Sequence, residues 1–421
     1  MSAGNLACQR DSYLRELHTT VATCTPAADG LFHVTFEDTV LFPEGGGQPH
    51  DTGSVNGTVA VVAVVRKGAV AVHHTQSPLE PGTPAHQTVD WKRRWDHMQQ
   101  HSAQHLITAV ASDQFGLKTT SWSLGATKST IDLVGERPLT DEVMQQLEDK
   151  VNEIIAEGRD VVATTYQPNS PELMAVRSRG LPEDVLASGA AIRVVSIGGL
   201  DVNTCCGTHV KSTAHLQTVK LLHTEASRGG SRLHFVAGER TRALLGAMYS
   251  DMRTLGKSFT CGLELVVDRA EGAIKTSKML GRQVKALLKE AAESAAKQLA
   301  EEAQQRTEAA SGSAVVVVHH HRDEADQDYL LTVASPLATL PIVAFLSITP
   351  PQEGSTPSYE GQFLLVGANE QHVAAAASAV SVIVDGKGGG KKGRFQGKAK
   401  QLTPANRAAA VAAIDAAIRA L

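Results

Sequence analysis

Two short strings, far apart in the sequence, each carry a pair of metal-binding side chains four positions apart. The first is His101-Ser102-Ala103-Gln104-His105, and the second is Cys205-Cys206-Gly207-Thr208-His209. Together they offer three imidazoles and a thiolate, which is a complete ligand set for one tetrahedral zinc ion. Each string alone is a weak signal, since a histidine on a helix more often belongs to a core. One ion would have to draw both strings together, so a shared site would organise a whole domain.

Neighbouring residues leave the ligand set open to variation. His97 lies on the same predicted helical face as the first string's histidines and offers a replacement ligand or a supporting group. Cys206 competes with Cys205 as the source of the thiolate. The histidine spacing matches that of HExxH zinc proteases, but Ser102 stands where those enzymes carry their glutamate general base. Peptide hydrolysis by that route is therefore not expected.

The first half of the chain predicts a barrel followed by a mixed domain. Residues 20–90 have the alternation and turns of strands, with Asn56-Gly57 as a hairpin signal, which predicts a small β-barrel. After it, helices are expected at 96–110 and at 140–158, the second begun by Thr140 and ended by Gly158. The extended segments expected in the same domain are 124–133, 191–197 and 218–223.

The second half predicts a long helical stretch and a compact α/β unit. Residues 268–310 are rich in Ala, Glu, Lys, Leu and Gln, which indicates one long helix or a helical hairpin that acts as spacer or oligomer contact. A strand at 314–318 and a closing helix at 404–421 follow. The fold class is thus α+β multidomain, since 421 residues exceed one core. The expected domains are the barrel (1–90), the mixed domain (91–240), the helical linker (241–310) and the C-terminal α/β domain (311–421).

Composition restricts the partners and the compartment. The net charge is −4, so nucleic-acid binding must depend on a local basic patch. Five irregularly spaced cysteines do not suggest a disulfide framework. The first residues have no apolar stretch of signal-peptide type, and no run of about 18 apolar residues predicts a membrane span. We expect a reducing, cytoplasmic setting and no membrane partner.

A glycine-rich string, Phe42-Pro43-Glu44-Gly45-Gly46-Gly47-Gln48-Pro49, is a third candidate for function. Three consecutive glycines let a backbone approach a ligand closely, and Gln48 can both donate and accept hydrogen bonds. A flexible turn between strands is the plain alternative. The string does not match the phosphate-binding P-loop, because no Gly-Lys-Ser/Thr follows it.

A basic run near the C-terminus offers a local patch for phosphates. Between residues 387 and 400 there is no acidic residue, and the basic ones are Lys387, Lys391, Lys392, Arg394, Lys398 and Lys400. Such a run suits contacts with a nucleic-acid backbone, although a solvated loop is the alternative. The triplet His319-His320-His321 is interpreted as a strand end with solvated imidazoles rather than as a second metal site.

The three strings, in this order, resemble the alanyl-tRNA editing proteins, or AlaX, and the editing domain of alanyl-tRNA synthetase. That family combines a Phe/Tyr-x-Glu-x-Gly-Gly-Gln segment, an HxxxH helix and a Cys-x-Gly-Thr-His segment. Residues 228–233 and 236–238 look like the segment that closes the editing domain. Residues 385–390 and 396–397 resemble the glycine-rich end of the synthetase's DHH-associated C-terminal domain. The resemblance covers nearly the whole chain and points to the long form of the family.

The resemblance implies roles for individual residues. It implies one zinc ion per chain, with His101, His105, Cys205 and His209 as its ligands. It implies that Thr39 probes the hydroxyl of a bound serine, and that Gln48 and Gly45, Gly46 and Gly47 form part of the site. Two departures are Cys206, where the synthetase usually has glycine, and Leu41, where an aromatic residue is common.

The activity implied is hydrolysis of the ester in Ser-tRNA(Ala), with Gly-tRNA(Ala) as a further candidate, and the implied partner is tRNA(Ala) mischarged with serine. An apolar pocket excludes an added hydroxyl poorly, so a second site that binds the hydroxyl can correct the error. Zinc would activate water or orient the substrate. A complete alanyl-tRNA ligase is not expected, because the β-rich first 90 residues leave no room for an ATP-binding aminoacylation domain. A non-catalytic tRNA-binding protein with a structural zinc remains the alternative.

Overall fold

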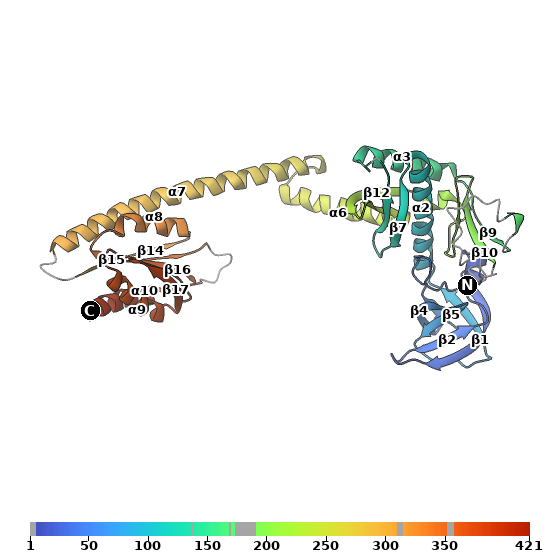
Figure 1. The fold of residues 1–421 in the computed structure, drawn as a ribbon, viewed down its shortest axis with the longest axis horizontal. Coiled ribbons are helices and arrows are strands. Elements are labelled where there is room, and N and C mark those ends of the chain that lie inside the picture. Colours follow the sequence, from blue (N-terminus) through green and yellow to red (C-terminus); the bar gives the residue numbers. More distant parts are fainter. Residues whose placement is uncertain (1–5, 137, 168–169, 173–190, 310–314, 352–357) are drawn as a thin grey trace. The chain divides into compact units, whose positions relative to one another are not determined.

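The structure is a computed structural model, and it describes the chain except residues 1–5, 137, 168–169, 173–190, 310–314 and 352–357 (Figure 1). It divides into two compact units, Met1–Thr254 and Leu255–Leu421, with the boundary inside helix α6 (Glu239–Phe259). The expected α+β multidomain class is confirmed. None of the helices in the described ranges is long and apolar enough to cross a membrane.

The N-terminal region forms the predicted closed antiparallel barrel. Its strands follow one another in the order β1-β2-β5-β4-β3-β6. Asn56 (φ 52°) and Gly57 (φ 70°) make the expected left-handed hairpin turn between β3 and β4. A short helix, α1 (Ala7–Arg10), precedes the barrel. The strands are β1 (Glu16–Pro26), β2 (Phe32–Phe36), β3 (Gly53–Val55), β4 (Val59–Lys67), β5 (Val70–Thr75) and β6 (Pro84–Val89).

Helix α2 (Trp91–Phe115) runs from the barrel through the core of the first unit. It extends beyond the predicted 96–110 at both ends. Asp90 caps its first turn by accepting a hydrogen bond from the Arg93 amide, and Gly116, at φ 66°, ends it. A buried ion pair between Arg94 and Asp51 ties the helix to the barrel.

Two antiparallel sheets flank α2 in the first unit (Figure 1). The predicted helix over 140–158 is confirmed as α3 (Asp141–Glu157), with Thr140 and Gly158 at its ends. The sheets are β12-β13-β8-β7 and β11-β10-β9, with bounds β7 (Lys118–Leu124), β8 (Ser129–Val134), β9 (Val161–Tyr166), β10 (Ile192–Ile197), β11 (Asp201–Thr204), β12 (Val219–Ser227) and β13 (Gly230–Ala237). The extended segment expected at 124–133 is confirmed over 129–133, which lies in β8, but residues 125–128 form the turn between β7 and β8, where a Cβ on Gly125 would lie 2.4 Å from the Lys128 carbonyl oxygen.

The second unit is a five-stranded sheet with helices on both faces. The long helix α7 (Val266–Ala309) is one helix, not a hairpin, and its C-terminal half packs with α8 (Gln327–Leu337) on one face of the sheet. Helices α9 (Glu370–Ile383) and α10 (Pro404–Arg419) cover the other face. The strand order is β14-β15-β16-β18-β17, with bounds β14 (Val316–Asp323), β15 (Ile342–Thr349), β16 (Gly361–Val366), β17 (Gly386–Lys391) and β18 (Arg394–Ala399).

Two expectations for this unit are corrected. The basic run is not a solvated loop, because it forms the β17–β18 hairpin at the edge of the sheet. The histidine triplet does not form a solvated strand end. His319 stacks on Phe345, the His320 ring nitrogen lies 2.9 Å from the Tyr329 hydroxyl, and His321 lies 2.8 Å from the Ser347 hydroxyl. Each of the three rings therefore has a contact partner within the unit.

Candidate metal centre

The two distant strings meet in the first unit. His101 and His105 lie one turn apart on α2, and Cys205 and His209 lie on the loop that follows β11. One ligand atom from each of these four residues lies within 4.8 Å of all the others. The Cys205 Sγ is 3.4 Å from His101 Nε2 and 3.2 Å from His209 Nε2. In a tetrahedral zinc site, bonds of about 2.3 Å to sulfur and 2.1 Å to nitrogen separate such atoms by about 3.5 Å, so the donor set fits zinc.

Gln48 from the glycine-rich string fixes the orientation of His101. Its Oε1 accepts hydrogen bonds from His101 Nδ1 and from the Thr208 amide, both at 2.9 Å, and its Nε2 donates to the Thr208 hydroxyl at 2.8 Å. The Thr208 amide identifies Oε1 as the acceptor, so His101 must carry its proton on Nδ1. The lone pair of His101 Nε2 is therefore directed at the cluster.

The other two imidazoles also have polar partners outside the cluster. The hydroxyl of Ser102 lies 3.2 Å from His209 Nδ1 and accepts a hydrogen bond from the Val210 amide. Asp201 Oδ2 lies 3.6 Å from His105 Nδ1. Such partners hold ligand rings in one orientation and raise their basicity. In the sequence, Ser102 argues only against a zinc protease and does not predict a contact with His209. No sequence feature indicates that Asp201 lies beside His105.

The buried charges suit a cation at the centre of the cluster. Burial opposes ionisation of the Cys205 thiol, but the charges of His101 and His209 and the ring hydrogen bonds hold its pKa well below the usual range. Burial lowers the pKa of His101, and that of His209 to about 3. Burial also acts to lower the pKa of His105, but hydrogen bonds with Asp201 and Cys205 raise it to about 9. Metal binding would displace the His105 proton.

Arg193 on β10 holds the cysteine-bearing loop by its main chain. Its buried guanidinium donates to the carbonyl oxygens of Cys205 at 2.8 Å and of Gly207 at 2.9 Å. The side chain of Gln9 donates to the remaining carbonyl of this turn, that of Cys206, at 2.8 Å. The loop is therefore fixed from behind, and Arg193 places a positive charge near the thiolate. Sequence reasoning gave no signal for either residue.

His97 and Cys206, the two alternative ligands that the sequence suggests, lie outside the cluster of four. His97 is buried, and burial lowers its pKa to about 4. Burial raises the pKa of the Cys206 thiol, so this residue favours its protonated form. The group His223, Glu225 and His234 also brings ligand atoms together, but His223 and Glu225 are exposed and the two rings stack on each other at 16°.

Glycine is required where the two strings touch. A Cβ on Gly207 would lie 2.3 Å from the His101 ring and 2.7 Å from Gln48 Oε1. The φ of Gly207 is not among the positive values, so it is the close approach of these side chains that requires glycine.

The glycine loop is closed by its own backbone. The amides of Gly45 and Gln48 each donate to the other residue's carbonyl oxygen at 3.2 Å. Gly46 and Gly47 have φ values of 58° and 78°, and a Cβ on Gly47 would lie 2.6 Å from the Trp122 ring. The loop therefore packs against the site as a defined turn, not as a flexible one.

A cavity of about 630 Å³ adjoins the cluster. Two of the four ligand residues, His105 and Cys205, lie in its wall, together with Gly46, Gly47 and Trp122. The rest of the lining is mainly polar and includes Gln104, Thr108, Thr119, Ser121, Asn203 and Thr204. A small amino-acid ester therefore has room beside the ligands.

Thr39 is not brought to this cavity. Its buried hydroxyl lies 2.8 Å from His73 Nε2 and 3.0 Å from Gln87 Oε1, and it accepts a hydrogen bond from the Leu41 amide at 3.0 Å. These partners belong to the barrel and its adjoining segment. In this structure Thr39 supports the barrel instead of facing the cavity.

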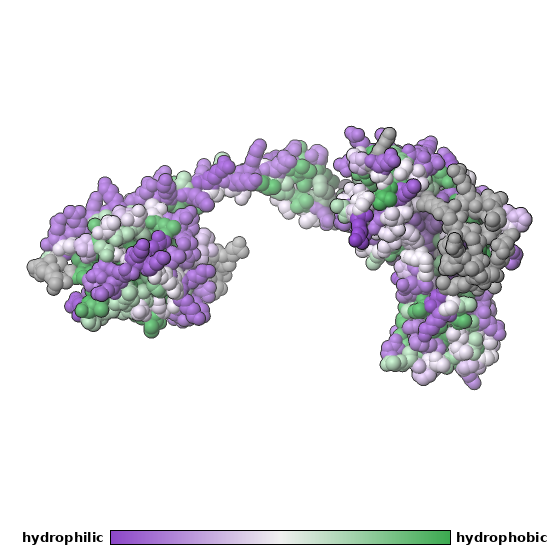
Figure 2. Space-filling model, in the orientation of Figure 1, coloured by the Kyte–Doolittle hydropathy of each residue, from purple (hydrophilic) through white to green (hydrophobic). Residues whose placement is uncertain are grey.

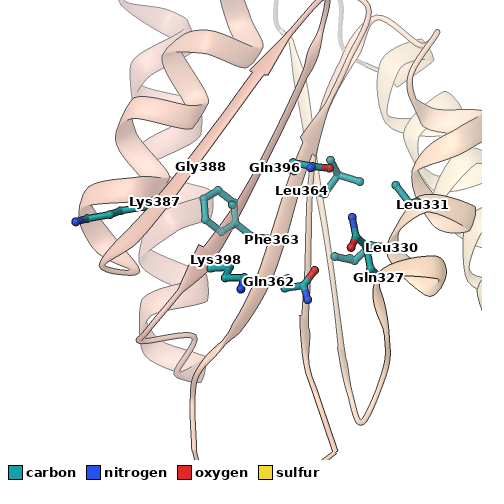
Figure 3. A pocket seen from close by; sticks show the side chains of 11 residues that line it. Gln327, Leu330, Leu331, Gln362, Phe363, Leu364, Lys387, Gly388, Gln396 and Lys398 are labelled. Atoms are coloured by element: carbon teal, nitrogen blue, oxygen red, sulfur yellow. The ribbon is translucent and has the colours of Figure 1, made fainter. Parts of the chain in front are cut away.

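The basic run at 387–400 has exposed side chains on and beside the β17–β18 hairpin, at the edge of the sheet. Lys387 pairs directly with Lys398, and Lys391 pairs with Arg394, across the β17–β18 ladder, while Lys392 occupies the turn. Like charges opposite one another destabilise a hairpin unless an anion lies between them. Beside this surface is a cavity of about 410 Å³ between the strands and α8, lined in part by Lys387, Lys398, Gln362, Gln396 and Gln327 (Figure 3).

Comparisons with known proteins agree with this site. The family model of the threonyl and alanyl tRNA synthetase second additional domain matches residues 192–233, which include the Cys205–His209 string. The chain is 40% identical over 409 residues to the alanyl-tRNA editing protein Aarsd1 of Mus musculus, and 37% identical over 407 residues to that of Danio rerio. Each alignment covers 94% of both chains. The chain belongs to the alanyl-tRNA editing protein family.

A longer relative is similar to this chain over part of its length. The chain described in this structure is 31% identical over 281 residues to the alanine–tRNA ligase of Thermococcus kodakarensis. That alignment covers 64% of the chain but only 30% of the ligase. The similarity is thus to part of the ligase.

Proposed function

We propose that this chain is a trans-editing hydrolase that cleaves the ester of Ser-tRNA(Ala) at one zinc ion held by His101, His105, Cys205 and His209. The observation that carries the proposal is the cavity of about 630 Å³ that has two of these four ligands in its wall. A zinc ion with a purely structural role needs no such opening. The chain's family membership supports the editing reaction.

When bound, zinc would supply Lewis-acid chemistry beside the cavity. The chain's own residues set up that chemistry. Gln48 keeps the lone pair of His101 on the cluster, and Arg193 holds the loop that carries Cys205. The glycine loop and Trp122 close one wall, so the ester has a restricted approach to the ligands.

The polar wall of the cavity favours serine over alanine. Three residues of this wall are joined by hydrogen bonds. Gln104 Nε2 donates to the Thr108 hydroxyl at 3.0 Å, and the Thr119 hydroxyl also donates to the Thr108 hydroxyl at 3.0 Å. The side-chain amide oxygen of Gln104, Oε1, is buried and has no hydrogen-bond partner among the described residues. A site with such groups gains a hydrogen bond from a seryl hydroxyl that an alanyl methyl group cannot give.

The test compares two histidine variants on the same helix. His105→Ala should lose both bound zinc and deacylation of Ser-tRNA(Ala). His97→Ala, which removes a buried histidine outside the cluster, should keep both. Full deacylation by zinc-free His105→Ala protein would contradict the proposed site.

We propose further that the β17–β18 surface holds the tRNA through its phosphates. Because the basic run is part of a sheet, substitutions test it better than a deletion of 386–400. Replacement of Lys387, Lys391, Lys392 and Arg394 by Gln should weaken tRNA binding and flatten its dependence on salt. An unchanged salt dependence would exclude this surface.

The closed set of four ligands favours one other function, that of a tRNA-binding protein with a structural zinc. In that case zinc removal would unfold the first unit, but wild-type protein would leave Ser-tRNA(Ala) intact. The same deacylation assay therefore separates the two functions.

A further inference from the structure

The N-terminal half of α7 is an exposed helical segment whose charged side chains from Gly272 onward are all basic. All residues from 271 to 287 are exposed. Apart from Val266 at the start of α7, the buried residues of this helix lie at 292 and later. From Gly272 to Lys289 there is no acidic residue, although the whole chain has a net charge of −4. The basic residues of this segment are Lys275, Lys278, Arg282, Lys285 and Lys289.

These five side chains form a single stripe. Their steps of three and four residues keep them within a band about 80° wide, and the stripe is about 21 Å long. The exposed apolar side chains Ile274, Leu280, Val284 and Leu287 are centred about 150° from the middle of the stripe, and Met279 lies about 80° from it. Figure 2 shows both hydrophilic and hydrophobic side chains along α7. A contact with the apolar side would therefore leave most of the stripe accessible.

The rest of α7 is charged differently. The last residue of the stripe, Lys289, pairs with Glu293, and beyond it opposite charges alternate at the i, i+4 spacing, as in Lys297–Glu301 and Glu302–Arg306. Such pairs stabilise a solvated helix, whereas like charges at the same spacing destabilise it. The stripe is thus unfavourable for a free helix and becomes favourable when an anion covers it.

We propose that the α7 stripe binds the phosphate backbone of tRNA, at a surface separate from the β17–β18 hairpin. The choice of RNA as the polyanion rests on the proposed function. A regular row of cations fits a row of phosphates, and it gives affinity without reading sequence. The second unit would then hold its RNA at two places, one on the sheet and one on the helix.

The test measures the salt dependence of binding to uncharged tRNA by the full-length protein, so it does not depend on hydrolysis. Replacement of Lys275, Lys278, Arg282 and Lys285 by Gln should lower the slope of log Kd against log salt by roughly three. The control replaces four exposed cations of the same unit outside the stripe, Lys257, Lys297, Arg306 and Arg419, by Gln. It should leave the slope within one unit of wild type.

An unchanged slope in the stripe variant, or an equal fall in the control, would overturn the proposal. Cosedimentation with phosphatidylserine vesicles tests the other polyanion. Vesicle binding that the stripe variant loses, with an unchanged tRNA slope, would assign the stripe to lipid. If wild type binds tRNA through the stripe but does not deacylate Ser-tRNA(Ala), the proposed function fails and the stripe stands.

Discussion

Gln48 is expected to act on zinc affinity through His101 and not by touching the metal. Gln48→Met keeps the length of the side chain but removes three hydrogen bonds, one with His101 Nδ1 and two with Thr208. Loss of a partner that orients a metal-bound histidine typically lowers affinity 10- to 100-fold, which corresponds to about 1.4–2.8 kcal/mol. The cost of leaving a buried donor such as His101 Nδ1 unpaired, about 1–3 kcal/mol, falls in the same range.

The assay is competition for zinc with a chromophoric chelator, with the variant and wild type in parallel. Gln100→Met is the matched control, since Gln100 is a buried glutamine that bonds both polar groups of Ala237, away from the cluster. That variant should lose thermal stability but keep wild-type zinc affinity. Zinc affinity of Gln48→Met within twofold of wild type would refute the role assigned to Gln48.

Three further predictions follow from buried contacts. Gly207→Ala should abolish zinc binding while the barrel stays folded, because its Cβ would overlap the His101 ring; full zinc content would contradict this. Burial lowers the pKa of His73 from 6.5 to about 4. Between pH 6.5 and pH 4, His73 therefore takes up a proton in the unfolded protein and stays neutral in the folded one. His73 alone should lower the free energy of unfolding by about 3 kcal/mol from pH 6.5 to pH 4, so His73→Gln should make the measured fall smaller by that amount. Thr39→Val should lower thermal stability and leave discrimination between Ser-tRNA(Ala) and Ala-tRNA(Ala) unchanged; altered discrimination with unchanged stability would place Thr39 in the pocket.

The sequence predicts those parts of the fold that depend on local pattern. Strand alternation and the Asn56-Gly57 turn identify the barrel, and the caps at Thr140 and Gly158 delimit α3. The meeting of His101, His105, Cys205 and His209 could be predicted because the two distant pairs together make up one zinc ligand set. Local pattern failed where a single residue changes the course of the chain, as Gly125 does between β7 and β8.

The supporting residues of the site could not be predicted, because they act over long tertiary distances. Arg193 binds main-chain carbonyls, which any sequence provides, so no motif marks it. Asp201 approaches His105 only after the β10–β11 hairpin has formed. The role that the resemblance assigns to Thr39 stays a prediction, and in this structure its hydroxyl has hydrogen-bond partners in the barrel.

The central claim is that zinc at His101, His105, Cys205 and His209 supports hydrolysis of the seryl ester. The most direct test measures the deacylation rates of Ser-tRNA(Ala) and Ala-tRNA(Ala) with zinc-loaded protein, with protein stripped by chelator, and with stripped protein to which one equivalent of zinc is returned. We predict rapid loss of the seryl ester with loaded and restored protein only, and slow loss of the alanyl ester throughout. Equal rates with loaded protein and with folded, stripped protein would contradict the account.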